Sequence, residues 1–379
     1  MDNIYITKAA VFFPNEPVGN DEMEQYLGMI GGKPSLAKRI VLGKNGIKSR
    51  YYALNKDGNA THTNVQIAAN AIRNLFDENI ALNDIDLLAC GTGTPDQLLP
   101  SHGVMVRGEL GGERNIEAAS FAGSCCTCMQ AMRYAFMSIL TGSANNAICC
   151  ASERASAWLT ARFFEKETEL LNKLDKRPML AFEKEFLRWV LSDGGAALLL
   201  QNKQAKNSLS LRVDWIEITS YAHELETCMY IGGEKCTDGS LSGWTSFPEN
   251  EWLTKSLFSI KQDTQVLGEN IVPIGGRYLM ELTNKRNFKD SEIDWFLPHL
   301  SSMFFKEQIM KEFEKIGFFI PEEKWFVNLP EIGNIGSASP FAMIEELLNS
   351  GKLKKDEKIL LMIPESARFS YSYCMLTVC

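Results

Sequence analysis

Three cysteines lie within four positions of the stretch "FAGSCCTCMQAM", residues 121–132. Cys125, Cys126 and Cys128 could belong to a zinc site, a redox pair, an apolar core or a nucleophilic centre. A structural zinc site needs four ligands, usually as two separated pairs, and the sequence has no second C-x-x-C and no H-x-x-H. A thioredoxin-like pair is typical of a small domain, near its beginning. We therefore expect no metal, and the pattern favours either a buried core thiol or a nucleophile.

Cys125 has the sequence position that a nucleophile requires. Gly123 and Ser124 end a loop, and apolar residues then recur at helical spacing as far as Leu140. Unpaired amides and the helix dipole at a helix start stabilise a thiolate, so this position predicts a lowered thiol pKa. The same amides could stabilise an oxyanion on an attached thioester. Without the rest of the chain, a core thiol is the simpler interpretation.

Two distant residues are candidate partners for this cysteine. Of four histidines, His299 ends the apolar stretch "WFLPHL", at the carboxyl end of a predicted strand, where α/β sheets present functional groups. Asn334 lies in "LPEIGNIGSASP", a glycine-rich turn before a predicted helix. His299 alone fits a core histidine as well as a catalytic one, and Asn334 alone is typical of a turn.

Taken together, these residues resemble the β-ketoacyl-acyl-carrier-protein synthase III family of thiolase-fold ketosynthases. The resemblance covers nearly the whole chain through six ordered motifs: "GIKSRYYA" (46–53), "TGTPDQLLPS" (92–101), "GSCCTCMQAM" (123–132), "LSDGGAALLL" (191–200), "PHLSS" (298–302) and "GNIGSAS" (333–339). It implies that Cys125 is the nucleophile and that His299 and Asn334 are its catalytic partners.

The chemistry that the resemblance implies is a Claisen condensation. Cys125 would take an acyl group from a thioester by nucleophilic attack. A neutral His299 and Asn334 would donate hydrogen bonds to the carbonyl of a second thioester and stabilise its enolate. That enolate would then attack the acyl group on Cys125 and form a carbon–carbon bond, with no organic cofactor.

Strand-length apolar stretches, among them "IDLLACGTG", "GGAALLLQ" and "KWFVNL", alternate with helix-period stretches along the chain, which predicts an α/β protein with largely parallel sheets. Residues 156–190 are predicted to form helices and residues 231–252 a loop. The alternation occurs twice, and similar acidic lead-ins, Asp84–Asp86 and Glu292–Asp294, precede one strand in each half. The resemblance implies a thiolase-like fold with duplicated βαβαβαββ halves in an α-β-α-β-α layering. We place the halves at residues 1–204, with the nucleophile, and 205–379, with His299 and Asn334.

Several positions depart from the synthase III pattern and are predicted to shape the substrate pocket. The region before "GIKSR" lacks the tryptophan that clamps the adenine of coenzyme A, and the family's carrier-docking arginine is Phe304 here. The glycine turn that supplies an oxyanion donor reads Ser366 to Arg368, and a gate position that is often aromatic is Leu99. Cys126 and Cys128 complete the predicted pocket set.

The ending "PESARFSYS", the long "GGKPSLAKR" segment and "SCCTCMQA" are similar to ketosynthase/cyclases that make dialkylresorcinols and stilbene precursors. This similarity implies condensation of a β-ketoacyl thioester with an α,β-unsaturated acyl thioester, followed by ring closure. A β-ketoacyl donor loses a proton instead of CO2, so a base is needed, and Glu153 after a predicted strand is a candidate. A structural carboxylate is the alternative for Glu153. A decarboxylative synthase III is the alternative function.

Composition sets the remaining expectations. The net charge is −8 and the pI about 5.3, which argues against a nucleic-acid partner. No signal peptide or membrane span is apparent, and ten cysteines fit a reducing compartment, so a cytoplasmic location is expected. A basic cluster could hold an acidic partner: Lys33, Lys38, Arg39, Lys44, Lys48 and Arg50. The family resemblance implies a homodimer and thioesters of acyl carrier protein or coenzyme A.

Two rival classes of protein fit the sequence less well. A papain-like protease shares the order Cys, His, Asn, but no tryptophan follows Cys125 and the cysteine lies far from the N-terminus. A non-catalytic ketosynthase-like partner would typically have lost the cysteine or the histidine, and this chain keeps both.

Overall fold

Nine strands form the main sheet of the computed structural model, which describes residues 3–173 and 182–379. Their spatial order is β13-β14-β15-β8-β1-β7-β6-β4-β5. The bounds are β1 Tyr5–Phe12, β4 Leu87–Thr92, β5 Glu117–Ala122, β6 Asn146–Glu153, β7 Gly194–Gln201, β8 Leu211–Ser220, β13 Trp295–Pro298, β14 Lys358–Glu365 and β15 Ser370–Val378. Short strands lie outside this sheet: β2 Val18–Gly19, β3 Ser49–Arg50, β9 Met229–Tyr230, β10 Gly233–Lys235, β11 Leu241–Gly243 and β12 Lys261–Gln262.

The strand order repeats within the sheet. In the first half β4 and β6 are parallel, while β6–β7 and β7–β1 are antiparallel; in the second half β13, β14, β15 and β8 pair in the same way. The acidic lead-ins are equivalent too, because Asp86 and Asp294 each accept a hydrogen bond from an amide at the start of the neighbouring parallel strand. The predicted boundary at 204/205 falls in the connection between β7 and β8.

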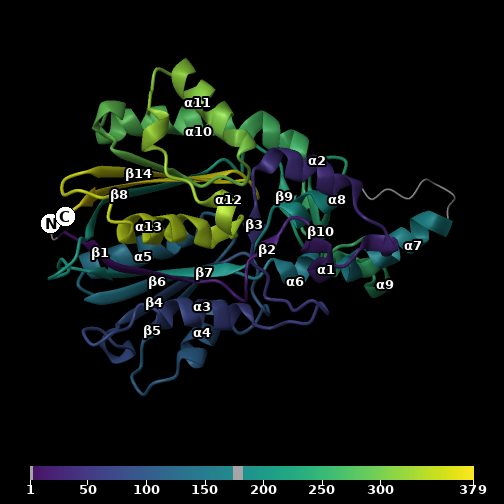
Figure 1. Ribbon diagram of the computed structural model, residues 1–379, viewed down its shortest axis with the longest axis horizontal. Helices are drawn as coiled ribbons and strands as arrows, with labels where there is room; N and C mark the ends of the chain where they lie inside the picture. Colours follow the sequence, from purple (N-terminus) through teal and green to yellow (C-terminus); the bar gives the residue numbers. More distant parts are fainter. Residues whose placement is uncertain (1–2, 174–181) are drawn as a thin grey trace.

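Helices complete a five-layer arrangement (Figure 1). Helices α3 (Asn64–Arg73) and α4 (His102–Leu110) cover the outer face of the first half, and α10 (Thr264–Arg286) and α11 (Phe304–Lys315) cover that of the second. Helices α5 (Thr127–Leu140) and α13 (Ser339–Asn349) lie between the two sets of strands. The predicted α/β class and α-β-α-β-α layering are confirmed.

Shorter helices surround one end of these layers. They are α1 Met23–Leu27, α2 Leu36–Asn45, α6 Ser156–Leu159, α7 Glu165–Lys173, α8 Phe182–Glu185, α9 Glu249–Thr254 and α12 Leu329–Ile332. The helices expected over 156–190 are therefore present in part, and residues 174–181 lie outside the described chain. In the predicted loop 231–252, the two short strands β10 and β11 pair with each other.

Each set of strands is covered by helices on both faces, which explains why the strand sequences are nearly continuous apolar runs. Strands β4 and β7 are almost entirely buried, since helices cover both faces. On α5 and α13 the buried residues are mostly apolar, among them Met129, Met132, Phe341 and Ile344. Cys149 and Cys150 belong to this sheet and are buried free thiols, which fits cysteine as a small core residue.

Two elements differ from the sequence prediction. The stretch "KWFVNL" was predicted as a strand, but only one parallel bridge forms, between Phe296 and Trp325. The second half therefore lacks the third strand of the βαβαβαββ pattern, and this single bridge occupies its place. Conversely, β5 was not predicted, because its sequence "EAASFA" is short, weakly apolar and partly exposed at the sheet edge.

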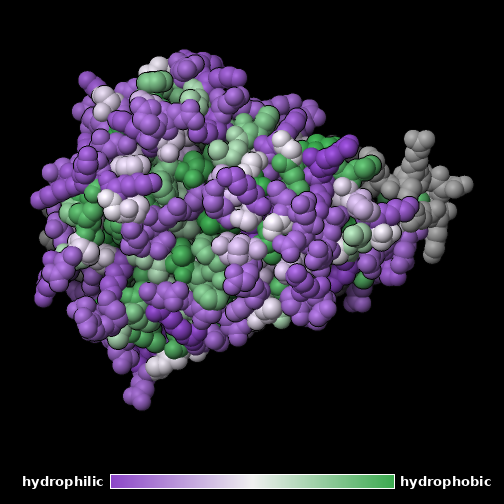
Figure 2. All heavy atoms as spheres, viewed as in Figure 1, coloured by the Kyte–Doolittle hydropathy of each residue, from purple (hydrophilic) through white to green (hydrophobic). Residues whose placement is uncertain are grey.

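Hydrophilic residues dominate the face drawn in Figure 2, with hydrophobic residues showing between them near its middle. No helix of the described residues is long and apolar enough to span a membrane.

Candidate active site

Cys125, Glu153, His299 and Asn334 line one cavity of about 240 Å³. They come from four places in the chain: the turn before α5, the end of β6, the turn after β13 and the turn before the 3₁₀ segment Gly336–Ala338. Most of the cavity lining is apolar. The structure thus brings the three residues expected from the motifs, and the candidate base, to the same enclosed space.

Cys125 is 9% exposed and lies two residues before the first helical residue of α5. Its Sγ lies 3.6 Å from Ser124 Oγ. Burial, and then the Glu365 carboxylate, raise the pKa of the Cys125 thiol to about 12. The expectation of a lowered pKa was therefore wrong. The physical reason is burial of the thiol, together with the Glu365 carboxylate, whose Oε2 accepts from the Cys126 amide at the helix start at 3.0 Å.

A backbone hydrogen bond fixes the position of His299, and its imidazole ring is buried. The backbone N–H of His299 donates to the carbonyl oxygen of Met362 on β14 at 2.8 Å, and the residue is 3% exposed. Burial lowers the pKa of His299 to about 4. The imidazole is therefore neutral at pH 7, the state in which one ring nitrogen donates a hydrogen bond and the other accepts one.

Asn334 is oriented by hydrogen bonds on both sides of its residue. Its Oδ1 accepts from Gly336 N at 2.9 Å, and its carbonyl oxygen accepts from Ser192 N at 2.9 Å. With Oδ1 engaged, the Nδ2 donors are available to the cavity. Gly333 permits this turn, because it has φ +71° and a Cβ there would lie 2.9 Å from Ser192 Cβ.

Glu153 is buried at the end of β6 and accepts hydrogen bonds with both oxygens. Oε1 accepts from Gly93 N at 3.0 Å and from Ser337 Oγ at 2.6 Å, and Oε2 accepts from Thr94 Oγ1 at 2.6 Å. Burial raises the pKa of Glu153, although these donors counteract the rise. The carboxylate thus joins the loop after β4 to the turn that follows Asn334.

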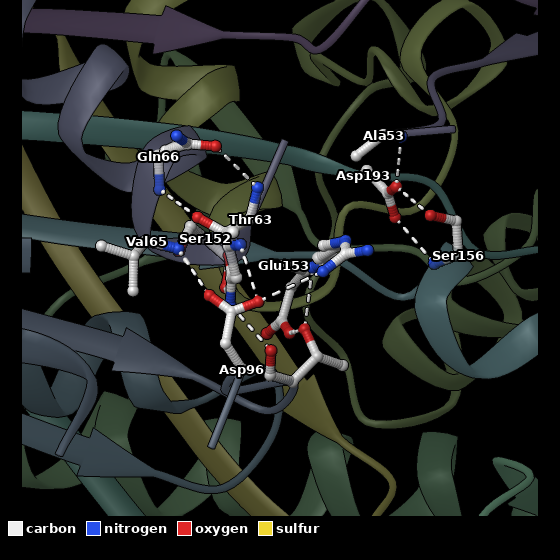
Figure 3. Close-up of polar contacts among 12 residues, drawn as sticks. Ala53, Thr63, Val65, Gln66, Asp96, Ser152, Glu153, Ser156 and Asp193 are labelled. Carbon is white, nitrogen blue, oxygen red and sulfur yellow. Dashed lines mark hydrogen bonds and ion pairs between the residues drawn. The ribbon is translucent and has the colours of Figure 1, made fainter. Parts of the chain in front are cut away.

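Figure 3 shows Glu153 among its polar neighbours. In the same view Asp193, from the "LSDGG" motif, accepts from Ala53 N at 2.6 Å and Ser156 N at 2.8 Å. Burial raises the pKa of Asp193 to about 6. This motif therefore positions loops beside the cavity, and Asp193 does not line the cavity itself.

Of the six residues predicted to shape the pocket, Ser366 lines the cavity and the other five do not. Cys126 and Cys128 are fully buried, and their thiols donate to the carbonyl oxygens of Ile363 and Cys125, both at 3.3 Å. Their side chains pack into the core between the sheets, because the turn before α5 directs only Cys125 to the cavity.

The remaining three predicted pocket residues lie on the surface. Leu99 is 85% exposed on the loop before α4, and Phe304 is 48% exposed at the start of α11, where the next residue, Phe305, turns inward instead. Arg368 is exposed, and its neighbour Ala367 lines the cavity. In the turn that replaces the glycines, the left-handed conformation falls on Phe369, with φ +56°. A buried aromatic residue in that conformation stores strain beside the site.

Sequence reasoning missed the apolar arm of the cavity. Helix α10 and the segments around β9 and β12 supply most of it, through Met229, Ile231, Ile260, Leu267 and Ile271. The apolar spacing of residues 264–286 would have indicated a buried helix, but Pro273 within it obscures the period. Glu365 was also missed, because nothing in "PESARF" indicates which way its side chain points.

Among the described residues, no three His, Cys, Asp or Glu side chains lie together in a group that could hold a metal ion. All ten cysteines are free thiols. Cys125, Cys126 and Cys128 therefore form neither a disulfide nor a metal cluster in this structure.

Comparison with known proteins bears on the fold and the reaction class. Residues 283–363 match the family model described as 3-oxoacyl-[acyl-carrier-protein (ACP)] synthase III C terminal. The β-ketoacyl-[acyl-carrier-protein] synthase III of Clostridium perfringens is 23% identical over 369 residues, which cover 96% of this chain and 95% of that protein. The protein is similar to this synthase over nearly its whole length, and it is a synthase III-like acyltransferase.

Solved structures show the same fold over nearly the whole chain. The synthase III of Aquifex aeolicus (TM-score 0.70, 19% identity) and a tetronic acid condensing enzyme (TM-score 0.76, 21% identity) each match 99% of both chains. OleA of Xanthomonas campestris, solved with bound lauric acid and lauroyl-CoA, matches 99% of both chains with a TM-score of 0.72 and 19% identity. The thiolase-like fold is confirmed, and the enzyme is an acyltransferase that performs a Claisen-type condensation.

Proposed function

We propose that this enzyme condenses a β-ketoacyl thioester with an α,β-unsaturated acyl thioester through an acyl group on Cys125, and then closes a ring. The observation that carries the proposal is the convergence of Cys125, neutral His299 and Asn334 on one largely apolar cavity. Ring closure rests on the sequence similarity to dialkylresorcinol and stilbene-precursor ketosynthase/cyclases.

The apolar arm supports acyl chains as substrates. Side chains from α10, β9, β12 and α11 line it, and burying a chain there releases about 0.8 kcal/mol per CH2 group. A structural relative holds lauric acid and lauroyl-CoA, and another acts in tetronic acid condensation. Both are consistent with substrates larger than an acetyl group.

The residues support the condensation in two steps. First, Cys125 Sγ forms a bond to the thioester carbonyl carbon, the bond to the carrier sulfur breaks, and the carrier leaves as a thiol. Second, the α-carbon of the other thioester becomes an enolate, whose oxygen accepts hydrogen bonds from His299 and Asn334 Nδ2. The enolate carbon attacks the acyl carbon, and Cys125 leaves.

Forming the enolate distinguishes the two candidate donors. A β-ketoacyl donor gives up an α-proton to a base, whereas a malonyl-type donor loses CO2. Glu153 is the only carboxylate among the described residues that line the cavity, which makes it the candidate base. Its saturated hydrogen bonds favour a positioning role instead, and the decarboxylative reaction is the alternative that needs no base.

We propose thioesters of an acyl carrier protein as the substrates, delivered on the side of α2. The C-terminal residue of α2, Asn45, accepts a hydrogen bond from Met303 N beside exposed Phe304. Arg39 and Lys44 are exposed on α2, so acidic carrier residues would find positive charge there. Two members of the predicted basic cluster do not contribute, because Arg50 is fully buried and Lys38 pairs with Glu24.

Intact-mass spectrometry tests the role of Cys125. Incubation with acyl thioesters should add one acyl group to the wild type and to Cys126→Ala, and none to Cys125→Ala. Cys126 is the matched control, because it is adjacent, equally small and buried away from the cavity. Loading that persists in Cys125→Ala would remove the assignment.

Product analysis then tests the substrates. Purified enzyme with paired β-ketoacyl and enoyl thioesters should give a condensed cyclic product by mass spectrometry. Product from malonyl thioesters alone would establish the decarboxylative alternative. Loading of Cys125 with no condensed product from either set would indicate a non-catalytic partner.

A further inference from the structure

Glu365 is a buried carboxylate beside the nucleophile that the condensation does not use. It ends β14, is 9% exposed, and forms no ion pair within residues 3–173 and 182–379. Burying an unpaired carboxylate is costly unless hydrogen bonds or protonation compensate. Such a group beside a reactive side chain indicates a role in setting its state.

The contacts of Glu365 place it at the start of α5. Its Oε2 accepts from the Cys126 amide at 3.0 Å, and the Cys126 thiol donates to Ile363 on the same strand at 3.3 Å. Burial raises the pKa of Glu365, and hydrogen bonds from the amides of Cys126 and Ser124 counteract the rise. Glu365 therefore lies beside Cys125, and the Cys126 amide, which could otherwise stabilise a thiolate, is occupied by its carboxylate.

We propose that Glu365 is a positioning residue that keeps Cys125 as a neutral thiol until a thioester binds. A second negative charge at this buried turn would be repelled, since no cation is present among the described neighbours to offset it. When acyl transfer occurs, the Cys125 proton leaves with the departing carrier thiol and Glu365 keeps its charge. The resting nucleophile is thereby protected from electrophiles other than the bound substrate.

Other titratable groups around Cys125 do not supply the missing positive charge. They are Glu153 on β6, Cys126 in the turn before α5, Cys128 on α5, neutral His299 after β13 and Tyr371 on β15. The negative charge of Glu153 also raises the pKa of the Cys125 thiol, but less than that of Glu365 does. Glu365→Gln is therefore the informative change, with Glu153→Gln as its matched control.

Iodoacetamide alkylation, measured residue by residue by mass spectrometry across pH 6–10, tests this proposal. In the wild type, Cys125 should react with an apparent pKa well above that of exposed Cys236, which serves as an internal reference in the same molecule. In Glu365→Gln the Cys125 rate at pH 7.5 should rise about tenfold for each unit that its pKa falls. Glu153→Gln should move it less.

Each result decides the proposal. A wild-type Cys125 that titrates at or below Cys236 overturns it, and this measurement needs no variant. A Glu365→Gln protein with native circular dichroism and an unchanged Cys125 profile overturns it as well. Because no thioester is present in the assay, its failure is distinguishable from failure of the proposed condensation.

Discussion

At the scale of single residues, the proposed chemistry of this site depends on three side chains whose types the sequence supplies. Cys125, His299 and Asn334 could be selected because six motifs occur in order along the chain, since each local pattern alone also fits a structural residue. Their protonation states could not be obtained that way. Glu365, which we propose disfavours a Cys125 thiolate, accepts a hydrogen bond from the Cys126 amide, 239 positions away in the sequence. Only the folding of the chain brings these two residues together.

A pH dependence of stability follows from the burial of His299. Its pKa falls from 6.5 to about 4 on folding, so between these values the unfolded chain binds a proton that the folded chain does not. The free energy of unfolding therefore decreases as pH falls below about 6.5. At about 1.4 kcal/mol per pH unit, the buried neutral His299 lowers the free energy of unfolding by ~2 kcal/mol at pH 5.

Urea unfolding of the wild type and His299→Asn at pH 7 and pH 5 checks this value. His102 changes stability in the same direction, and Asp193 and Glu365 change it in the opposite one, so only the difference between the two proteins is informative. His299→Asn should lose ~2 kcal/mol less than the wild type between the two pH values. Equal losses would mean that His299 is solvated in the native protein.

At the scale of elements, the sequence predicted the strands that are buried on both faces and missed β5 at one edge of the sheet. β4, β6 and β7 read as apolar runs because helices cover both sides, and α5 and α13 show the helical period. β5 escaped prediction because edge strands are short and partly polar, and "KWFVNL" was predicted as a strand although tertiary packing allows it one bridge. Strand propensity alone cannot tell these two cases apart.

Glu153 acts at this scale, since its carboxylate joins the loop after β4 to the turn before α13. Glu153→Gln would turn an amide NH2 toward groups that are themselves donors, Gly93 N, Thr94 Oγ1 or Ser337 Oγ. Leaving one buried donor unsatisfied costs about 1–3 kcal/mol. We expect that loss of unfolding free energy by chemical denaturation, with Cys125 acyl loading retained.

The same variant decides whether Glu153 is also a base. Condensation of a β-ketoacyl thioester that survives in folded Glu153→Gln excludes the base role. A loss confined to that donor, with loading and stability near the wild type, would assign it.

At the scale of the whole molecule, the duplication links fold and site. The repeated strand order places the carboxyl ends of β4, β6, β13 and β14 around the gap between the halves, and each half supplies part of the cavity lining. Cys125 and Glu153 come from the first half, His299 and Asn334 from the second. The acidic lead-ins were a weak sequence sign of this repeat, and their equivalent hydrogen bonds show why they recur.

The free edge of β5 leads to a prediction about assembly. Glu117 N and Gly123 N donate toward β4, so alternation along the strand turns the Ala118 amide outward, away from the sheet. Leu98 and Leu99, 74% and 85% exposed, adjoin this edge through Ser101, which accepts from Ser120 Oγ at 3.0 Å. An unpaired edge beside exposed leucines suits a second copy paired antiparallel across a two-fold axis, as expected for the homodimer.

Light scattering during gel filtration tests this arrangement. Wild-type protein should be a dimer at micromolar concentration. Ala118→Pro, which removes an outward N–H, and Leu99→Lys should each shift it toward monomer while circular dichroism stays native. Leu36→Lys is the matched control, because Leu36 is 70% exposed on α2, whereas the predicted interface is formed by β5 and the loop before α4. A dimer that persists in Ala118→Pro, or that Leu36→Lys disrupts, would place the interface elsewhere.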